Sequence, residues 1–202
     1  MSPMGPPLIL ASGSKTRLTL LEQAGLIVDA EPPSVDEQEM KAAFHAERAP
    51  AEACAEALAE LKATRVSQRH PGALVIGADQ MLDLNGVWFD KPADLDHARA
   101  HLQALRGQTH RLVTAAVVAL NGSRIWHTLD TARLTMRPFS DAFLDEYLRR
   151  QGPAVLSSVG AYHLEGLGAQ LFSKVEGDFF TILGLPLLPL LGFLRGHGAL
   201  PK

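Results

Sequence analysis

The chain has 202 residues, of which 47% are hydrophobic, so it is long enough and apolar enough to bury a sizeable core. Its 19 Lys and Arg residues against 22 Asp and Glu residues give a formal net charge of −3. This balance excludes a general attraction for nucleic acid or for an anionic membrane, so an anionic ligand would need a local pocket. We therefore expect a globular protein that binds neither a nucleic-acid polymer nor a membrane.

The single cysteine and the hydropathy pattern bear on the cellular compartment. Cys54 excludes an intramolecular disulfide and a cysteine-based zinc site. The first ten residues lack the basic segment of a secretory signal, and the most apolar segment, 179–194, is shorter than a membrane span of about 20 residues and is broken by proline and glycine. We expect a soluble cytoplasmic protein.

The first half of the chain alternates between predicted strands and helices. A buried strand over 7–12 is followed by a helix that Ser14 can cap and Gly25 can end. Residues 28–35 look extended, EQEMKAAFHAE is typical of a helix, and a longer helix follows Pro50.

The second half adds two hairpins to this alternation. The apolar run ALVIGADQMLDL predicts a central strand that returns through Asn85-Gly86 as VWF, and Asn121-Gly122 joins two strands of about ten residues or more, HRLVTAAVVAL and RIWHTLDTARLTMR. Helices are expected from Asp94 through Leu105, after Ser140 and after Pro186, with a short strand and a glycine-punctuated segment between the last two. The pattern predicts an α/β fold with a mixed sheet and flanking helices.

The stretch ASGSKTR, between the first strand and its helix, predicts an anion site. Free backbone N–H groups and the partial positive charge of a helix N-terminus favour phosphate, and Ser12, Ser14 and Thr16 add hydroxyl donors. Arg17 adds a planar fork suited to phosphate oxygens, and Lys15 adds a point charge. The alternative is a capped helix with exposed basic residues, which the dipole disfavours unless an anion lies between them.

Asp79 in VIGADQ ends an apolar strand at the edge where ligands of α/β proteins commonly bind. Its carboxylate could hold Mg²⁺ or accept a proton from water. A strand-end aspartate that only satisfies a turn is an equally good interpretation of this stretch alone.

Lysines and acids elsewhere could join Asp79. If the strand VWF pairs with the strand that carries Asp79, Lys91 in FDKP returns to the same end of the sheet. Lys62 alone would be interpreted as a solvated lysine, and Asp36 and Glu37 as acids at a helix N-terminus.

Beyond these residues, the chain resembles a known family. LASGSKTRLTLL resembles the LASxSPRRxxLL signature of the Maf family of nucleoside triphosphate pyrophosphatases. The similarity continues in order with VDE, LKA, VIGADQ, DKP, LRG, TARLTMRPFS, VGAYHLEGLGAQLF, EGDFF and LGLPLLPLL. It covers nearly the whole chain.

The resemblance implies one domain over residues 1–202, with a mixed α/β fold and two lobes around a deep cleft. It implies hydrolysis of a nucleoside triphosphate to the monophosphate and pyrophosphate with a divalent metal, Mg²⁺ or Mn²⁺, and members are often dimeric. Members are linked to septum formation or division arrest and to the removal of non-standard nucleotides.

The resemblance also assigns roles to individual residues. Asp79 matches the catalytic acid or base and, with Glu37 of the VDE motif, would hold the metal. The substrate-binding residues carried over, or inferred at the same turn, are Ser12, Ser14, Arg17, Lys62, Lys91 and Glu165. We expect Arg17, Lys62 and Lys91 to stabilise the departing pyrophosphate.

The chain departs from the family signature at Lys15 and Thr16, where Pro and Arg are usual. Gln80, where thymidine and uridine triphosphate enzymes tend to have Thr, and Glu165, in place of Gln, are more similar to the subgroup that acts on 7-methylguanosine triphosphate. A carboxylate suits a guanine N–H edge and a cationic methylated base. The missing arginine leaves a second hypothesis, a nucleotide-binding regulator of cell division with weakened catalysis.

Overall fold

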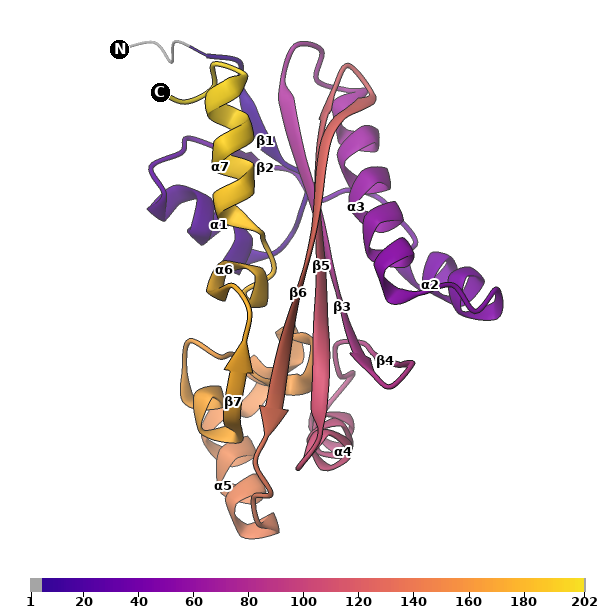
Figure 1. Ribbon diagram of the computed structural model, residues 1–202, viewed down its shortest axis with the longest axis vertical. Helices are drawn as coiled ribbons and strands as arrows, with labels where there is room; N and C mark the ends of the chain where they lie inside the picture. Colours follow the sequence, from indigo (N-terminus) through magenta and orange to yellow (C-terminus); the bar gives the residue numbers. More distant parts are fainter. Residues whose placement is uncertain (1–4, 202) are drawn as a thin grey trace. The chain divides into compact units, whose positions relative to one another are not determined.

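The computed structural model describes residues 5–201, in which helices and strands alternate along the chain (Figure 1). The strands are β1 (Leu8–Leu10), β2 (Asp29–Ala30), β3 (Leu74–Leu84), β4 (Val87–Phe89), β5 (Thr109–Leu120), β6 (Ser123–Met136) and β7 (Phe172–Glu176). The α-helices are α1 (Lys15–Gln23), α2 (Glu37–Ala46), α3 (Ala51–Ser67), α4 (Leu95–Leu105), α5 (Asp141–Gln151), α6 (Phe179–Ile182) and α7 (Leu187–Gly196). Three 3₁₀ turns follow α5: η1 (Gly152–Ser157), η2 (Val159–Ala161) and η3 (Leu167–Leu171).

The strands form one seven-stranded mixed sheet, which confirms the predicted α/β class. Its order is β2-β1-β3-β5-β6-β7, with β4 paired to β3. The β1 strand runs parallel to both β2 and β3, whereas β4 and β7 run antiparallel to β3 and β6.

Both predicted hairpins form at their Asn-Gly pairs. The φ angles are 53° and 88° at Asn85 and Gly86, and 51° and 78° at Asn121 and Gly122. Two consecutive residues with positive φ match the twist of the flanking strands, and Asn and Gly are the residues that best tolerate this conformation.

The chain divides into two compact units, each built from separated segments. The first contains the residues up to Gln80, Thr114–Asp130 and those from Phe179 onward, and the second contains Met81–Val113 and Thr131–Asp178. The long strands β3, β5 and β6 therefore each contribute residues to both units. The deep cleft that the family resemblance implies stays a prediction.

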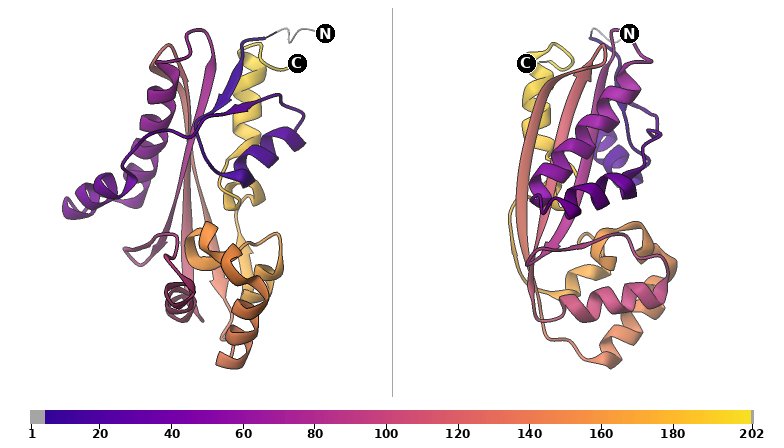
Figure 2. Two further views of the ribbon diagram at one scale, coloured as in Figure 1. Left: turned by 180° about the vertical axis from the view of Figure 1, so that it is seen from behind. Right: turned by 90° about the vertical axis from the view of Figure 1, so that its right-hand side faces the viewer.

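In the first unit, helices cover both faces of the sheet. Even-numbered residues of β1 and β3, such as Leu10 and Ile76, pack with Leu21 of α1 and Leu190 of α7, while Val75 on the other face packs with α3 (Figures 1 and 2). Successive side chains of a strand point to opposite faces, so Gln80 follows the α1 and α7 face and Asp79 the α3 face.

In the second unit, α4 and α5 pack with the 3₁₀ turns that follow α5 (Figure 2). Its buried polar contacts include His110 Nε2 at 2.7 Å from the Tyr162 hydroxyl, and the Tyr147 hydroxyl donating to the Ala161 carbonyl at 3.0 Å. Asp83 accepts from the backbone N–H of Gly86 at 2.8 Å and thereby supports the first hairpin turn.

Several boundaries differ from the sequence prediction. The extended segment over 28–35 forms only the two-residue strand β2, because prolines at 32 and 33 lack the N–H that a longer ladder needs. The glycine-punctuated segment contains 3₁₀ turns, and the short helix α6 precedes α7. None of the helices over residues 5–201 is both long enough and apolar enough to cross a lipid bilayer.

Candidate functional site

The predicted anion turn forms between β1 and α1. Ser14 is the N-cap of α1, and its hydroxyl oxygen accepts from the backbone N–H of Arg17 at 3.3 Å. The Ser14 N–H in turn donates to Ser12 Oγ at 3.1 Å. These bonds shape the loop around its two serines, as the capping pattern predicted.

Donor groups at this turn remain available to an anion. Among the described residues, the backbone N–H groups of Lys15 and Thr16 have no hydrogen-bond acceptor, as is usual in the first turn of a helix. No acidic side chain lies in that turn. Two cations at Lys15 and Arg17 therefore meet the positive end of the helix dipole, an arrangement that a bound anion would stabilise.

The Arg17 side chain is held by two neutral acceptors. Its Nε donates to the Gly184 carbonyl at 2.7 Å, and its Nη1 donates to Ser12 Oγ at 3.3 Å. Burial lowers the pKa of the guanidinium, while the negative charges of Asp79 and Glu37 raise it. Arg17 remains a permanent cation that the protein has partly removed from water.

Lys62 joins the two acidic residues that the family resemblance assigned to the metal. Its Nζ lies 2.7 Å from Asp79 Oδ1 and 2.8 Å from Glu37 Oε1. The Lys62 and Asp79 side chains are each 6% exposed, whereas Glu37 is 45% exposed. The interpretation of Lys62 as a solvated lysine is therefore wrong, because α3 turns it toward Asp79. Asp79 itself lies in the middle of β3 and not at a strand end, because the apolar pattern continues to Leu84.

The close packing of α3 on β3 explains how Lys62 reaches Asp79. A Cβ atom at Gly77 would lie 2.3 Å from the carbonyl oxygen of Ala59 and 2.7 Å from the backbone N of Ala63, so only glycine allows this approach. Gly77 and Asp79 share one face of β3, and Ala59 and Lys62 are one helical turn apart.

One oxygen of Asp79 has no hydrogen-bond partner in the part of the chain that the structure describes. Asp79 Oδ2 is buried and makes no hydrogen bond to any residue in 5–201, whereas Oδ1 accepts from Lys62. A buried carboxylate oxygen without a donor is costly unless a ligand, a water or a metal satisfies it. Over the same residues, no three His, Cys, Asp or Glu side chains come together as a metal site.

Gln80, the neighbour of Asp79, binds the opposite face of the strand. Its Nε2 donates to Thr114 Oγ1 at 2.9 Å, to the Thr181 carbonyl at 2.9 Å and to the Ile182 carbonyl at 3.1 Å. The Thr181 hydroxyl donates to Asp130 Oδ2 at 2.7 Å. The amide donors of Gln80 are therefore used inside the protein.

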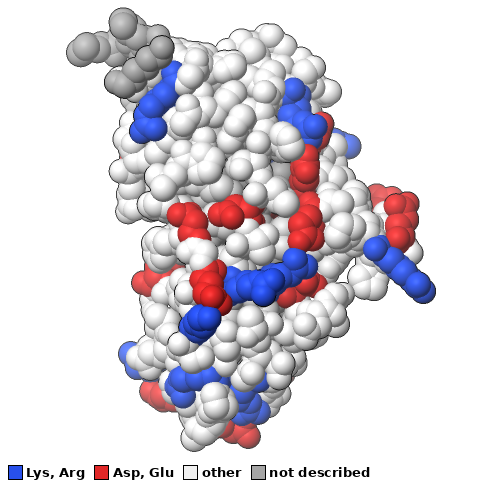
Figure 3. All heavy atoms as spheres, in the orientation of Figure 1, with Lys and Arg blue, Asp and Glu red and all other residues white. Residues whose placement is uncertain are grey.

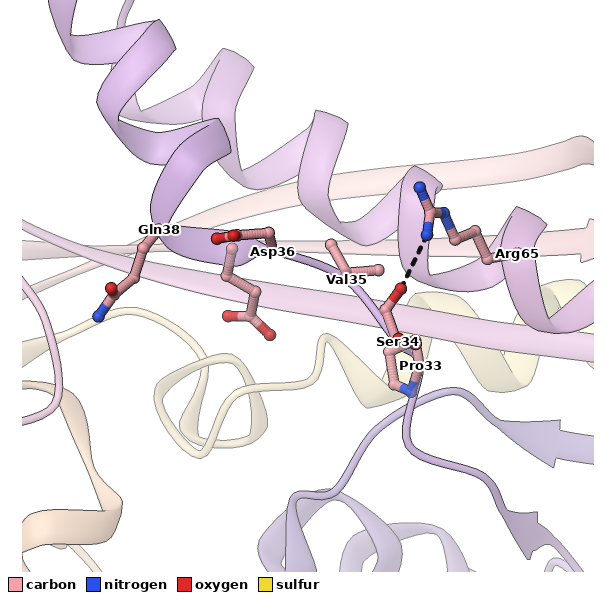
Figure 4. Close-up of a pocket in the computed structure, with 7 residues that line it drawn as sticks. Pro33, Ser34, Val35, Asp36, Gln38 and Arg65 are labelled. Atoms are coloured by element: carbon pink, nitrogen blue, oxygen red, sulfur yellow. Dashed lines mark hydrogen bonds between the residues drawn. The ribbon is translucent and has the colours of Figure 1, made fainter.

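A pocket of about 690 Å³ opens at the start of α2. Figure 4 shows the residues that line it. Arg65 of α3 donates to the Ser34 carbonyl at 2.9 Å and so connects the loop before α2 to α3 (Figure 4). Glu37 lines this pocket and also contacts Lys62. The residues that line the pocket are Pro33, Ser34, Val35, Asp36, Glu37, Gln38 and Arg65.

Lys91 and Glu165 belong to the second unit, and both are exposed. The pairing of β4 with β3 on which the Lys91 prediction depends is present, with Phe89 opposite Leu82. Their approach to Asp79 stays a prediction.

The sequence did not predict the residues that hold the side chains of Arg17 and Gln80 in place. Gly184, Thr181 and Asp130 take part in contacts between residues that are 51 to 167 positions apart, and no periodicity or spacing in the sequence marks such contacts. The segment LGLPLLPLL shows its apolar character and its family resemblance in the sequence, but neither feature predicts a contact with Arg17.

The site therefore defines a class of protein: an α/β protein with an anion turn at a helix N-terminus and a buried acid–lysine pair in the middle of a central strand. Acidic and basic side chains are interspersed in small groups on the face in Figure 3, in keeping with the net charge of −3. A local pocket, and not the field of the whole molecule, would have to hold an anionic ligand.

Comparison with known proteins gives the family. The family model described as Maf-like protein matches residues 7–197, so the chain belongs to the Maf family and the resemblance read from its motifs is confirmed.

Curated relatives align over nearly their full length. A protein of Paramagnetospirillum magneticum named nucleoside triphosphate pyrophosphatase is 60% identical over 95% of this chain and 99% of the relative. One of Rhodospirillum rubrum with the same name is 53% identical over 99% of both chains. One of Mesorhizobium japonicum named 7-methyl-GTP pyrophosphatase is 50% identical over 98% of this chain and 99% of the relative.

Proposed function

We propose that this protein hydrolyses a nucleoside triphosphate to the nucleoside monophosphate and pyrophosphate. The observation that carries the proposal is the buried Asp79 Oδ2, which has no hydrogen-bond partner among the described residues and lies in the same charge cluster as Arg17 of the anion turn. The names of the full-length relatives support the same reaction.

The residues of the cluster divide the chemistry between them. Lys62 holds Asp79 through Oδ1, so that Oδ2 can accept a proton from an attacking water. The water oxygen forms a bond to the α-phosphorus, and the bond from that phosphorus to the bridging oxygen breaks with its electron pair on pyrophosphate. Arg17 offsets the charge of that leaving group.

The donor set fits a divalent metal that the substrate helps to hold. Mg²⁺ is usually bound by one or two carboxylates together with phosphate oxygens and waters, and not by a full cage of protein ligands. The half-exposed Glu37 would hold Mg²⁺ or Mn²⁺ together with substrate oxygens in this proposal, and Asp79 Oδ2 would be the second carboxylate ligand where it does not act as the base. Such a metal supplies Lewis-acid stabilisation of phosphate charge.

The base preference rests on Glu165 in this proposal. The donors of the Gln80 amide are bonded to Thr114, Thr181 and Ile182, which leaves Gln80 as a residue of the site's framework. A glutamate suits the N–H edge of guanine and a cationic methylated base. The name of the Mesorhizobium japonicum relative supports 7-methyl-GTP as a substrate to include.

A nucleotide panel tests the proposal. Pyrophosphate release is measured with Mg²⁺ and with Mn²⁺ from 7-methyl-GTP, UTP, TTP and the common nucleoside triphosphates. We expect metal-dependent release from at least one of them. Binding of nucleotides without any cleavage would overturn the proposal in favour of the regulator of cell division. Cytoplasmic location, a homodimer and a link to septum formation stay predictions from the family.

A further inference from the structure

We propose that the turn from Thr181 to Gly184 is the positioning element of Arg17. It fixes the guanidinium so that its charge and its outer N–H groups face the phosphates, and it ties that orientation to the strand that carries Asp79. This inference rests on the proposed function, because it assigns Arg17 to the phosphates of the substrate.

The first step of the argument is the kind of acceptor that holds Arg17. Within residues 5–201, the guanidinium of Arg17 makes no ion pair at 4.0 Å or less. Its two hydrogen bonds go to the Gly184 carbonyl and the Ser12 hydroxyl. A carboxylate in direct contact would neutralise the guanidinium and compete with phosphate. Neutral acceptors instead fix its direction and leave its charge for a ligand, with Nη2 unused by any described residue.

The second step is the anchoring of the turn itself. The Thr181 carbonyl accepts from Gln80 Nε2 and, at 3.1 Å, from Thr114 Oγ1, and the side chains of both threonines are fully buried. The Thr181 hydroxyl donates to Asp130 on β6 at 2.7 Å. The turn is therefore held by β3, β5 and β6 together, and its position is fixed relative to the sheet.

The third step joins the turn to the catalytic acid. Gln80 is the next residue after Asp79 on β3, and it donates to the carbonyls of Thr181 and Ile182. Two residues further on, Gly184 accepts from Arg17. One short segment thus connects Asp79, through its neighbour, to the cation of the anion turn.

The fourth step is the requirement for glycine at position 184. Its φ of 100° is a conformation that other residues rarely adopt. A Cβ atom there would lie 3.4 Å from Arg17 Nε and 3.5 Å from Nη2, in van der Waals contact with the guanidinium, so the requirement for glycine comes from the backbone conformation. Conformation and contact together make Gly184 the residue through which the turn aims Arg17.

The test is a double-mutant cycle between Gly184→Ala and Arg17→Ala. We expect Gly184→Ala to lower kcat/KM by about ten- to a hundredfold, as a small misplacement of a charge-stabilising group does. In the Arg17→Ala background the same change should cost less than about twofold, because Gly184 acts through Arg17. An equal loss in both backgrounds would overturn the proposal. Gly192→Ala in α7, where a Cβ meets nothing within 4 Å, is the matched control.

A second pair of variants covers the case in which Gly184→Ala does not fold. Thr181→Val removes the hydroxyl that donates a hydrogen bond to Asp130, and Thr181→Ser keeps this hydroxyl. Thr181→Val should weaken inhibition by pyrophosphate about tenfold and Thr181→Ser should restore it; equal inhibition in all three proteins would count against the proposal.

A spectroscopic readout separates this inference from the proposed function. The Arg17 Nε–H signal in a proton–nitrogen NMR spectrum reports its bond to Gly184 whether or not the protein turns over nucleotides. We expect slow solvent exchange in the wild type and fast exchange in Thr181→Val. If the wild-type protein releases no pyrophosphate, the proposed function is wrong. If solvent exchange of the Arg17 Nε–H is unchanged in Thr181→Val, the positioning role of the turn is wrong.

Discussion

Lys62 and Asp79 form a buried ion pair in which the ammonium contacts only one oxygen of the carboxylate, Oδ1, at 2.7 Å. Glu37 shares the same ammonium at 2.8 Å, and Arg17 lies within electrostatic reach of both acids. The cluster therefore holds two negative and two positive charges, which makes its burial tolerable. The asymmetry of the pair leaves Asp79 Oδ2 as the oxygen that can bind a ligand or take a proton.

Asp79→Asn should abolish turnover without unfolding the protein. The amide keeps the size of the side chain and an oxygen for Lys62, but it can neither take a proton from water nor carry a charge. We expect pyrophosphate release to fall at least about a hundredfold, the lower end of what general base catalysis contributes. Exposed Asp96 in α4 offers the control Asp96→Asn. Near-normal turnover in Asp79→Asn would remove Asp79 from the chemistry.

Lys62→Met should destabilise the protein because it leaves the Asp79 carboxylate buried without its counter-ion. Breaking a buried pair from one side costs about 3–5 kcal/mol, whereas an apolar replacement of both partners is often neutral. The free energy of unfolding, measured by urea titration, should fall in Lys62→Met and recover in the double variant Lys62→Met/Asp79→Leu. A loss below about 1 kcal/mol in the single variant would mean that water screens this pair as it does at a surface.

Local sequence signals predicted most of the fold. Ser14 and Asp94 cap their helices as expected, each accepting from the backbone N–H three residues on. Asn121-Gly122 joins β5 to β6. Each of these features depends on residues only a few positions apart, which is why a single sequence reveals them.

The site could be predicted only in part, because its members meet through the tertiary fold. The anion turn was visible, since β1 and α1 are adjacent in sequence. The pairing of Lys62 with Asp79 depends on how closely α3 approaches Gly77, and the bond from Arg17 to Gly184 joins residues 167 positions apart. No periodicity records such contacts; the family resemblance assigned Lys62 and Asp79 to one site but predicted neither contact.

Gly77→Ala should loosen the packing of α3 on β3 and weaken the site with it. The added methyl group would lie 2.3 Å from the Ala59 carbonyl oxygen, so the helix that carries Lys62 must shift. Overpacking of this kind costs about 1–3 kcal/mol. We expect a lower urea midpoint together with reduced pyrophosphate release. Gly192→Ala should instead hold or raise the midpoint, because alanine is favoured over glycine inside a helix by about 0.5–1 kcal/mol.

His110 should make the protein less stable as the pH falls from about 6.5 to about 4. Burial lowers the pKa of this imidazole from 6.5 to about 4, and its Nδ1 has no partner among the described residues. Below pH 6.5 the unfolded chain binds a proton that the folded protein does not accept until about pH 4. Protonation therefore stabilises the unfolded state as the pH falls. The free energy of unfolding decreases by about 3 kcal/mol across this window.

His110→Gln tests this pH dependence, since the amide can still bond the Tyr162 hydroxyl but does not titrate. Carboxylates also titrate between pH 4 and 6.5, so the informative quantity is the difference in unfolding free energy between wild type and variant, measured by urea titration at several pH values. That difference should shift by about 3 kcal/mol in favour of His110→Gln as the pH is lowered. Parallel curves for His110→Gln and the wild type would mean that the buried imidazole is protonated as readily in the folded protein as in the unfolded chain.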